Sequence, residues 1–370
     1  MVEDIPPKSF DDLKAEVGDR GICGECGGCV SFCSAHDLEA IELPKGGGPP
    51  RYKNKDKCQH DGICYLVCPQ IRVLKKELDE KFDFKPRIGN YAKVASVQAV
   101  DDAIKKKATD GGAVTAILAY LLQKKLIDGA MVAKKSGPFN RVPFLALSRD
   151  DLLEAAGSHF DVSGHVTELK NYNTFISAVT ALRRNVGSDT MKLAVVATPC
   201  QIGSIRRMQM LNILPSHVVE YTLGLFCNMN FKFDAAARER MEKKFGFSFD
   251  DVENMNIKDE MILNVKGKGE IRIGFDDLKD YARPACFACP DFTNVYADIS
   301  FGGLGSEDGY TTVLTRTKKG QDIFREARTE GFIVEPPEQN TSVKKSAMLA
   351  NLIGFSERKL DRYKEKMDSL

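Results

Sequence analysis

The sequence contains no tryptophan, only five histidines, and no excess of charge of either sign. Lysine and arginine number 53 against 52 aspartates and glutamates, so the net charge of +1 gives no general case for binding nucleic acid or a membrane surface. Long apolar runs are also missing, because the longest, around Gly111–Leu122, is too short to span a bilayer. The start of the chain has no basic stretch followed by an apolar one, so we expect no secretory signal and a cytoplasmic protein.

The remaining composition is ordinary except for its cysteines. Apolar residues make up 43% and charged residues 28% of the 370 residues, which is enough for a buried core in two or three domains. The eleven cysteines are an odd number in a chain without an expected signal peptide, which argues against a disulfide framework. Reduced thiolates are then candidate metal ligands, and burial as a small apolar side chain is the alternative for isolated cysteines such as Cys227.

The first four cysteines, Cys23, Cys26, Cys29 and Cys33, follow the spacing of bacterial ferredoxins. In that pattern three thiolates on one loop hold a cluster, and the fourth reaches a second cluster. The glycines between these cysteines let the backbone curl around iron and sulfide. We therefore predict a ferredoxin-like domain over residues 1–85. Zinc is the alternative metal, because tetrahedral thiolate sites also use closely spaced cysteine pairs.

A second run repeats this pattern with one departure, because Asp61 stands where the second cysteine would be. The ligands predicted for the first 4Fe–4S cluster are Cys23, Cys26, Cys29 and Cys68. Those predicted for the second cluster are Cys33, Cys58 and Cys64, with Asp61 as an oxygen ligand or with no fourth ligand. The second cluster is then either a 4Fe–4S cluster of altered potential or a 3Fe–4S cluster.

Beyond residue 91 short apolar runs alternate with amphipathic stretches, which indicates an α/β (α+β) domain with a mixed sheet over residues 91–335. Residues 336–370 are expected to form a helical extension. The predicted strands are Ala130–Ala133, Lys192–Thr198, Val218–Phe226, Asp298–Phe301, Val313–Thr315 and Phe332–Val334. The predicted helices are Gly111–Ile127, Asp150–Ala156, Thr174–Arg184, Ile202–Met210, Phe233–Phe245 and Ser342–Met367. Met261–Phe275 reads as a hairpin and Leu43–Lys57 as a loop.

Four cysteines remain, and two of them, Cys200 and Cys227, follow predicted strands. The other two, Cys286 and Cys289, form a CxxC pair. Ligands gather at the carboxyl ends of strands in open α/β sheets, so these four thiolates can converge on one cluster. Each of them is equally compatible with a buried cysteine.

An ordered set of motifs surrounds these cysteines: TDGG, ATPCQ, GLFC, RPACFACPDF, ADISFGGLG and GYTTVLTRTK. Over roughly Val94–Gly331 the set resembles the family of beta subunits of coenzyme F-420-reducing hydrogenase and dehydrogenase. With its N-terminal ferredoxin module, the chain is most similar to the input subunit of F-420H2 dehydrogenase. The resemblance implies a bound FAD, coenzyme F-420 as substrate, and a third cluster, 4Fe–4S, on Cys200, Cys227, Cys286 and Cys289.

The glycine-rich motifs are expected to approach the flavin or its phosphates closely, but a full GxGxxG for NAD is missing. The expected cofactor-binding residues are Asp110, Gly111, Gly112, Thr198, Pro199, Gln201, Gly302, Gly303, Gly305 and Arg316. The cations expected to line the path of the anionic deazaflavin tail, unless they are solvated surface charges, are Lys134, Lys135, Arg206, Arg207, Arg316 and Lys318. The GSHF segment, Gly157–Phe160, departs from the family by placing His159 where relatives have a fixed cation.

The resemblance implies reversible hydride exchange between F-420 and FAD, followed by single-electron transfer through the clusters to a partner protein. The partner would be a hydrogenase, a formate dehydrogenase, a heterodisulfide reductase or a membrane dehydrogenase complex, which would make the chain peripheral to the membrane. No side chain is needed as a general base. Two alternatives stay open: a ferredoxin-dependent flavin reductase of the same family acting on another substrate, and a pure electron-transfer or zinc-structured interaction protein.

Overall fold

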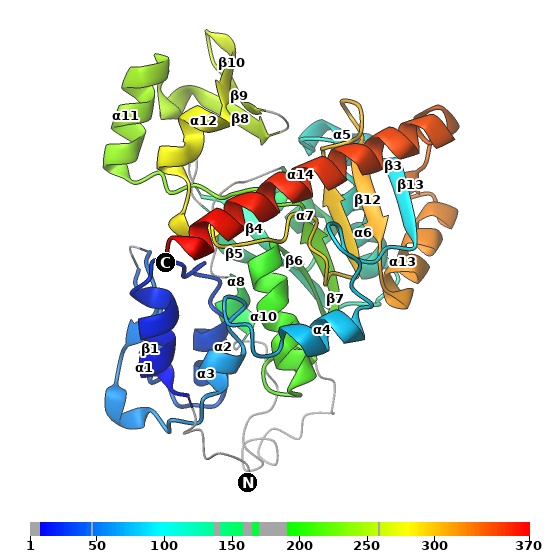
Figure 1. Ribbon diagram of the computed structural model, residues 1–370. Helices are drawn as coiled ribbons and strands as arrows, with labels where there is room; N and C mark the ends of the chain where they lie inside the picture. The colour runs from blue at the N-terminus through cyan, green and yellow to red at the C-terminus, as the bar shows by residue number, and fades with distance from the viewer. Residues whose placement is uncertain (1–7, 46, 137–140, 158–164, 170–190, 258–259) are drawn as a thin grey trace.

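The computed structural model describes residues 8–370 except 46, 137–140, 158–164, 170–190 and 258–259. Its centre is an eight-stranded mixed sheet in the order β13-β3-β12-β11-β7-β6-β4-β5 (Figure 1). The four neighbouring strands β11, β7, β6 and β4 run parallel, and antiparallel strands flank them on both sides. The strands are β3 (Lys93–Ala99), β4 (Gly129–Lys135), β5 (Arg141–Ala146), β6 (Leu193–Ala197), β7 (Val219–Leu225), β11 (Ile299–Gly302), β12 (Thr311–Thr315) and β13 (Ile333–Val334).

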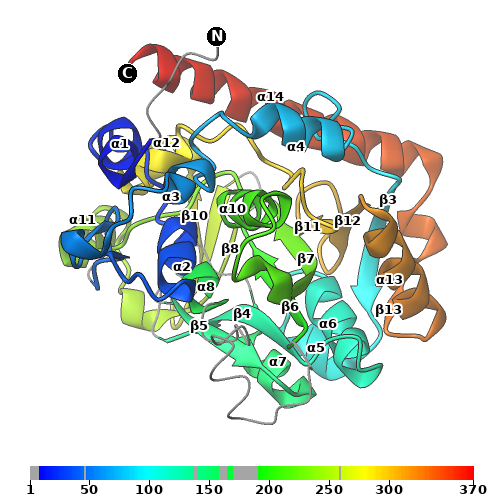
Figure 2. The same cartoon turned by 90° about the horizontal axis from the view of Figure 1, so that it is seen from below.

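Helices cover both faces of this sheet, which explains why its central strands are apolar throughout. In β6, Leu193, Val195 and Ala197 join one buried cluster, while Ala194 joins the cluster on the opposite face. The second face is covered by α5 (Asp102–Lys107), α6 (Ala113–Gln123), α7 (Arg149–Ala155) and α13 (Lys318–Thr329) (Figure 2). The first face is covered by α10 (Pro199–Met210), with α4 (Lys75–Lys81) and α8 (His165–Glu168) beside it.

The N-terminal module consists of short elements wound around two loops that repeat one another. These elements are α1 (Phe10–Leu13), a π-helical turn Lys14–Gly18, α2 (Gly28–Ala35), β1 (Ile41–Glu42), β2 (Arg51–Tyr52) and α3 (Ile63–Leu66). In the first loop Glu25 and Gly27 have positive φ values of 52° and 84°. His60 and Gly62, each 35 positions later, have values of 54° and 73°. The two loops therefore share one backbone path, and Asp61 occupies the place that Cys26 has in the first loop.

The module and the sheet share one hydrophobic core. Phe10, Phe32 and Val67 of the module lie in the same buried cluster as Met131 of β4 and Ile202 of α10. Residues far apart in sequence thus hold the N-terminal module against the first face of the sheet. The division of the chain at residues 85, 91 and 335 stays a prediction.

Two further units complete the fold. A three-stranded antiparallel sheet, ordered β10-β9-β8, packs with α11 (Ala235–Phe245) and α12 (Phe275–Leu278) around its own core. Its strands are β8 (Val252–Ile257), β9 (Glu260–Val265) and β10 (Gly269–Gly274). The 27-residue helix α14 (Ser342–Asp368) crosses the large sheet and ends between the N-terminal module and α12 (Figures 1 and 2).

Most of the predicted elements are confirmed, including the buried strand β6, the hairpin β9–β10 and the C-terminal helix. The α/β mixed-sheet fold class is confirmed as well. The prediction that Leu43–Lys57 is entirely a loop is wrong, because Arg51–Tyr52 forms a short strand that pairs with Ile41–Glu42. The predicted helix Thr174–Arg184 lies outside the described residues. None of the helices within the described ranges is long and apolar enough to cross a bilayer.

Candidate cofactor site

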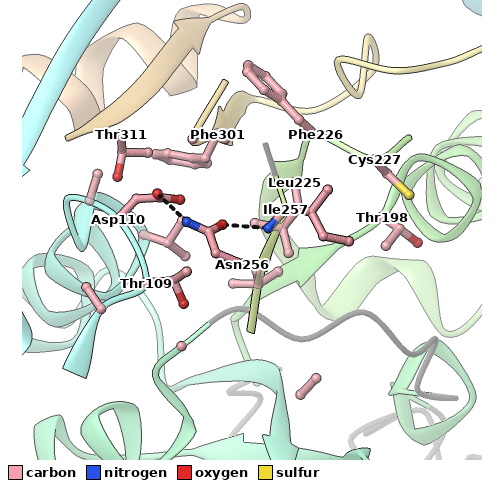
Figure 3. Close-up of a pocket in the computed structure, with 18 of the residues that line it drawn as sticks. Thr109, Asp110, Thr198, Leu225, Phe226, Cys227, Asn256, Ile257, Phe301 and Thr311 are labelled. Atoms are coloured by element: carbon pink, nitrogen blue, oxygen red, sulfur yellow. Dashed lines mark hydrogen bonds between the residues drawn. The ribbon is translucent and has the colours of Figure 1, made fainter. Parts of the chain in front are cut away.

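A cavity opens where the four parallel strands of the large sheet end. Its wall includes residues from the carboxyl ends of β4, β6, β7 and β11, the start of α6, and β8 of the small sheet (Figure 3). This edge is where α/β sheets bind ligands, because the chain turns away there and leaves a crevice. The lining is mostly apolar, and its polar residues include Thr109, Asp110, Thr198, Gln201 and Asn256.

Phenylalanine supplies the rings of the cavity wall in this chain without tryptophan. Phe226 and Phe292 lie 5.7 Å apart between ring centroids, and Phe292 stacks on Phe355 of α14 at 5.5 Å. Phe275 and Phe301 complete the set. These rings give a flat, water-excluding surface that suits a ring system.

A polar contact joins the small sheet to the opposite wall of the cavity. The amide of Asn256 donates to Asp110 Oδ1 at 3.3 Å, while its own oxygen accepts the Ile257 N–H at 2.8 Å (Figure 3). A Cβ at Gly303 would come within 2.6 Å of Asp110 Oδ2, so glycine is needed for the chain to pass this carboxylate. Asn256 was missed by sequence reasoning because it lies in β8, which has no motif.

Six of the expected cofactor-binding residues line the cavity: Asp110, Gly112, Thr198, Gln201, Gly302 and Gly303. Gly112 has φ of 73° and immediately precedes α6, whose first N–H groups have no partner within the helix and lie at the cavity wall. Gln201 Oε1 accepts from the backbone N–H and the hydroxyl of Thr198, so both residues shape the turn into α10. Three expected residues, Gly111, Pro199 and Gly305, are not part of the lining.

Arg316 is also absent from this cavity, and its role in the structure is internal. All five of its N–H donors are used, by the Ser300 hydroxyl, the Ile88 and Asn90 carbonyls, and the carbonyl and hydroxyl of Thr293. Arg316 follows β12, whose carboxyl end lies at the opposite edge of the sheet from the cavity because β12 is antiparallel to β11. Arg316 therefore lies outside this cavity, with its guanidinium bound to other parts of the protein.

The other expected cations do not line the cavity either. Arg206 forms an ion pair of 3.0 Å with buried Asp298, and Arg207 donates to the carbonyls of Gly203 and Ile71. Lys134 pairs with Glu154, and Lys318 with Asp322 at 2.8 Å. Lys135 is exposed. His159 lies outside the described residues.

Burial raises the pKa of Asp298, but the charge of Arg206 and hydrogen bonds from Thr317 and Thr222 outweigh it and lower the pKa overall. The pair is therefore ionised and ties α10 to the start of β11.

The four downstream cysteines come together beside the cavity, and we name Cys200, Cys227, Cys286 and Cys289 the inner set. Burial and the neighbouring charges of Cys286 and Cys289 raise the pKa of both Cys200 and Cys227. Asn230 donates from its backbone to Cys286 Sγ and from its amide to Cys227 Sγ, each at 3.3 Å. Cys227 itself lines the cavity, so the inner set borders the space available to a cofactor (Figure 3).

The first ferredoxin-type set, Cys23, Cys26, Cys29 and Cys68, surrounds a small cavity of its own. Burial and the charge of Cys68 raise the pKa of Cys26 to about 12. Buried thiols of this kind hold their protons until a metal displaces them.

The second ferredoxin-type set consists of Cys33, Cys58, Cys64 and Asp61. Burial, then the charges of Asp61, Cys58 and Cys33, raise the pKa of Cys64 to about 12. Asp61 Oδ1 accepts the Ile63 N–H at 2.9 Å, and this side chain is exposed.

The first set neighbours each of the other two sets, and we call this arrangement the row. Burial and then Cys26 raise the pKa of Cys200, and a Cβ at Gly24 would lie 3.8 Å from the Sγ of Cys200. Cys29 of the first set is likewise acted on by Cys64 of the second. Among the described residues, no three His, Cys, Asp or Glu side chains are grouped as the shell of a single metal ion. The sets are neighbouring thiols, and their binding of iron is a proposal.

Two basic residues of α14 reach the inner set and were missed by sequence reasoning. Lys359, only 2% exposed, donates to the carbonyls of Cys227 and Asp291, the latter at 2.6 Å. Arg362 donates to the Asn228 carbonyl at 2.8 Å and lies 5.2 Å over the Phe287 ring. Burial lowers the pKa of Lys359, but the charges of Cys289, Cys227 and Cys286 outweigh it and raise the pKa.

Two family models match this chain: the N-terminal part of the coenzyme F-420 hydrogenase/dehydrogenase beta subunit over residues 94–170, and its C-terminal part over residues 190–340. The chain belongs to this family. The resemblance read from the motifs is therefore confirmed.

Individual relatives extend the match. The chain is 31% identical over 327 residues to the coenzyme F-420-dependent sulfite reductase of Methanocaldococcus jannaschii, covering 83% of this chain and 46% of that protein. It thus spans less than half of that relative. It is 25% identical over 335 residues to an F(420)H(2) dehydrogenase subunit of Methanosarcina mazei, covering 90% of this chain and 88% of the relative.

A solved structure is similar as well. The F-420-reducing [NiFe] hydrogenase complex from Methanosarcina barkeri contains a chain with a TM-score of 0.66 and 28% identity, covering 77% of this chain and 94% of that one.

Proposed function

We propose that this chain is an iron–sulfur flavoprotein subunit that exchanges hydride between coenzyme F-420 and FAD and passes single electrons to a partner protein. The observation that carries the proposal is the inner set of cysteines at the wall of a ring-lined cavity, at the carboxyl edge of the parallel strands. When bound, the flavin would couple a two-electron hydride donor to one-electron iron–sulfur clusters.

The residues present fit a flavin in the cavity. The phenylalanines exclude water and offer flat surfaces for the ring system. The start of α6, with Gly112 in the left-handed region, offers N–H groups to a diphosphate. Asn256 and Asp110 fix the small sheet against this helix start, so the wall opposite the inner set stays in place.

The row of cysteine sets supports an order for the electron carriers. The inner set lies near Gly24 and Cys26 of the first ferredoxin-type set, and Cys29 of the first set lies near Cys64 of the second. We therefore propose that electrons pass from the cavity to the inner set, then to the first set, and leave from the second. Asp61 and His60 make the second set the exposed end of the row.

Because the second set is the exposed end of the row, we propose that it exchanges electrons with a partner protein. We propose that this partner is a protein and not a nucleic acid. Hydrogenase, formate dehydrogenase and F(420)H(2) dehydrogenase complexes are candidate partners, since relatives carry such names. We propose a cytoplasmic location, peripheral to the membrane where the partner is a membrane complex.

A second candidate keeps the same input but changes the final acceptor. The part of the sulfite reductase relative that matches this chain makes up 46% of that protein. The remaining part has no counterpart in the matched region of this chain. Under this alternative the chain feeds electrons to a separate reductase protein.

Anaerobic purification followed by metal, sulfide and flavin analysis tests the proposal. We expect about 12 iron per chain if all three sets hold 4Fe–4S clusters, or about 11 if Asp61 leaves a 3Fe–4S cluster. Reduced F-420 should bleach the flavin and reduce an artificial acceptor. Zinc without flavin would instead support the interaction protein, and flavin and iron that do not respond to F-420 would support another substrate.

A further inference from the structure

Helix α14 places a buried lysine directly behind a cysteine of the inner set. Lys359 is 2% exposed, and lysine is almost never buried to this degree without partners. Its ammonium donates to the carbonyl of Cys227 and to the carbonyl of Asp291, two residues beyond Cys289. The lysine thus contacts the backbone next to ligands from two separate segments.

A second cation from the same helix lies one turn further on. Arg362 donates to the carbonyl and the side-chain oxygen of Asn228, at 2.8 and 3.2 Å, and covers the ring of Phe287. Asn228 and Phe287 directly follow Cys227 and Cys286 in sequence. Both cations therefore belong to the surroundings of the inner set.

These contacts come from a part of the chain outside the family models. The models end at residue 340, whereas α14 begins at Ser342. The four cysteines and most of the sheet and cavity are in the matched part, whereas the two cations, like Phe355 of the cavity wall, lie beyond it.

We propose that Lys359 and Arg362 raise the reduction potential of the cluster on the inner set. This inference rests on the proposed function, because it requires a cluster there. A cluster held by four thiolates is net negative and gains a further negative charge on reduction, so a fixed cation nearby stabilises the reduced form more than the oxidised one. Burial strengthens the effect, because water does not screen the charge.

The position of Lys359 separates this role from a purely structural one. Two backbone carbonyls need only hydrogen-bond donors, and a neutral glutamine or a water can supply those. What a neutral group does not supply is the charge. Lys359 is a positioning residue for Cys227 and Asp291 in either case, and only the reduction potential reports its charge.

The test is a redox titration of the anaerobically purified full chain, followed by electron paramagnetic resonance of the inner cluster. For Lys359→Met we expect the ratio of reduced to oxidised inner cluster, measured at a fixed solution potential, to fall at least tenfold. For a one-electron couple this is a downward shift of the reduction potential by about 59 mV or more. Lys359→Arg should restore the wild-type potential. Lys364→Met is the matched control, because Lys364 lies on the same helix, is exposed, and pairs with Asp361 at 3.1 Å.

An inner cluster that is intact in Lys359→Met and titrates as in the wild type overturns the proposal. If that variant loses the inner iron, Arg362→Gln decides, because it removes one charge and leaves the contacts of Lys359 in place; a wild-type potential there overturns the proposal too. Wild-type protein without any third cluster contradicts the proposed function itself, and the iron count distinguishes that result from an unchanged potential.

Discussion

Gly302 is the position where a single methyl group should disturb the cavity most. A Cβ added there would lie 2.2 Å from Phe226 Cδ2, 2.6 Å from Cγ and 2.9 Å from Cβ. Since carbon atoms in contact rest about 3.5 Å apart, the ring must retreat by roughly 1.3 Å. A change of rotamer does not suffice, because the Cβ of Phe226 is itself too close and its backbone N–H is held by the Phe301 carbonyl at 2.7 Å.

We therefore expect Gly302→Ala to push Phe226 into the cavity. Overpacking of this kind costs about 1–3 kcal/mol. If about 1.4 kcal/mol of that cost falls on the ligand-bound state, the Kd for FAD rises tenfold. The assay is fluorescence quenching of FAD titrated with deflavinated protein.

Gly274→Ala is the control for this experiment. Gly274 has a negative φ of −66°, and its added Cβ would meet nothing within 4 Å. It should bind FAD like the wild type. Should Gly302→Ala bind FAD with unchanged affinity as well, the flavin does not occupy this cavity, and the proposed site is wrong.

Four further predictions concern the cysteine sets and the buried ion pair. Cys289→Ala should lose about four iron per chain while both ferredoxin-type clusters keep their spectra; an unchanged iron count would remove Cys289 from the ligands. Asp61→Cys should change the resonance spectrum and potential of one cluster, and an unaltered spectrum would show that Asp61 is not near the iron. Arg206→Met should destabilise the chain by about 3–5 kcal/mol in thermal unfolding, because it leaves Asp298 buried and unpaired. Since the pKa of Asp298 is lowered in the folded state, the wild-type stabilisation is present above about pH 4 and fades in stronger acid, whereas Asp298→Asn should lack this fading.

The repeat of the two N-terminal loops could be predicted from the sequence. The cysteine spacing defines the ferredoxin loops because a few consecutive residues determine them, and the repeated positive φ values at Glu25 and His60 agree with that alignment. Whether Cys200, Cys227 and the CxxC pair lie close to one another depends on the order of the strands in the sheet. The spacing of these cysteines in the sequence does not determine that order.

Arg316 shows what the motifs could not predict. A basic residue after a strand is a reasonable ligand for an anionic tail, but whether its donors are free depends on loops more than 200 positions away in the sequence. Those loops use the Ile88 and Asn90 carbonyls to satisfy the guanidinium.

Lys359, in contrast, left a signal that was overlooked. Met348, Leu352 and Phe355 precede it at spacings of four and three, which places all of them on one face of a helix. Met348 and Leu352 are buried, so a lysine continuing that stripe is itself expected to be buried.

The core shared by the N-terminal module and the large sheet has a consequence for the rate of the proposed electron transfer. Tunnelling between redox centres weakens exponentially with separation, so a module on a loose tether would conduct only in occasional favourable orientations. Phe10, Phe32 and Val67 are packed with Met131 and Ile202, and swinging the module away would expose all of them to water. If the three sets hold clusters as we propose, hydrophobic packing keeps the spacing along the row constant, and electron transfer inside the chain requires no movement of the module.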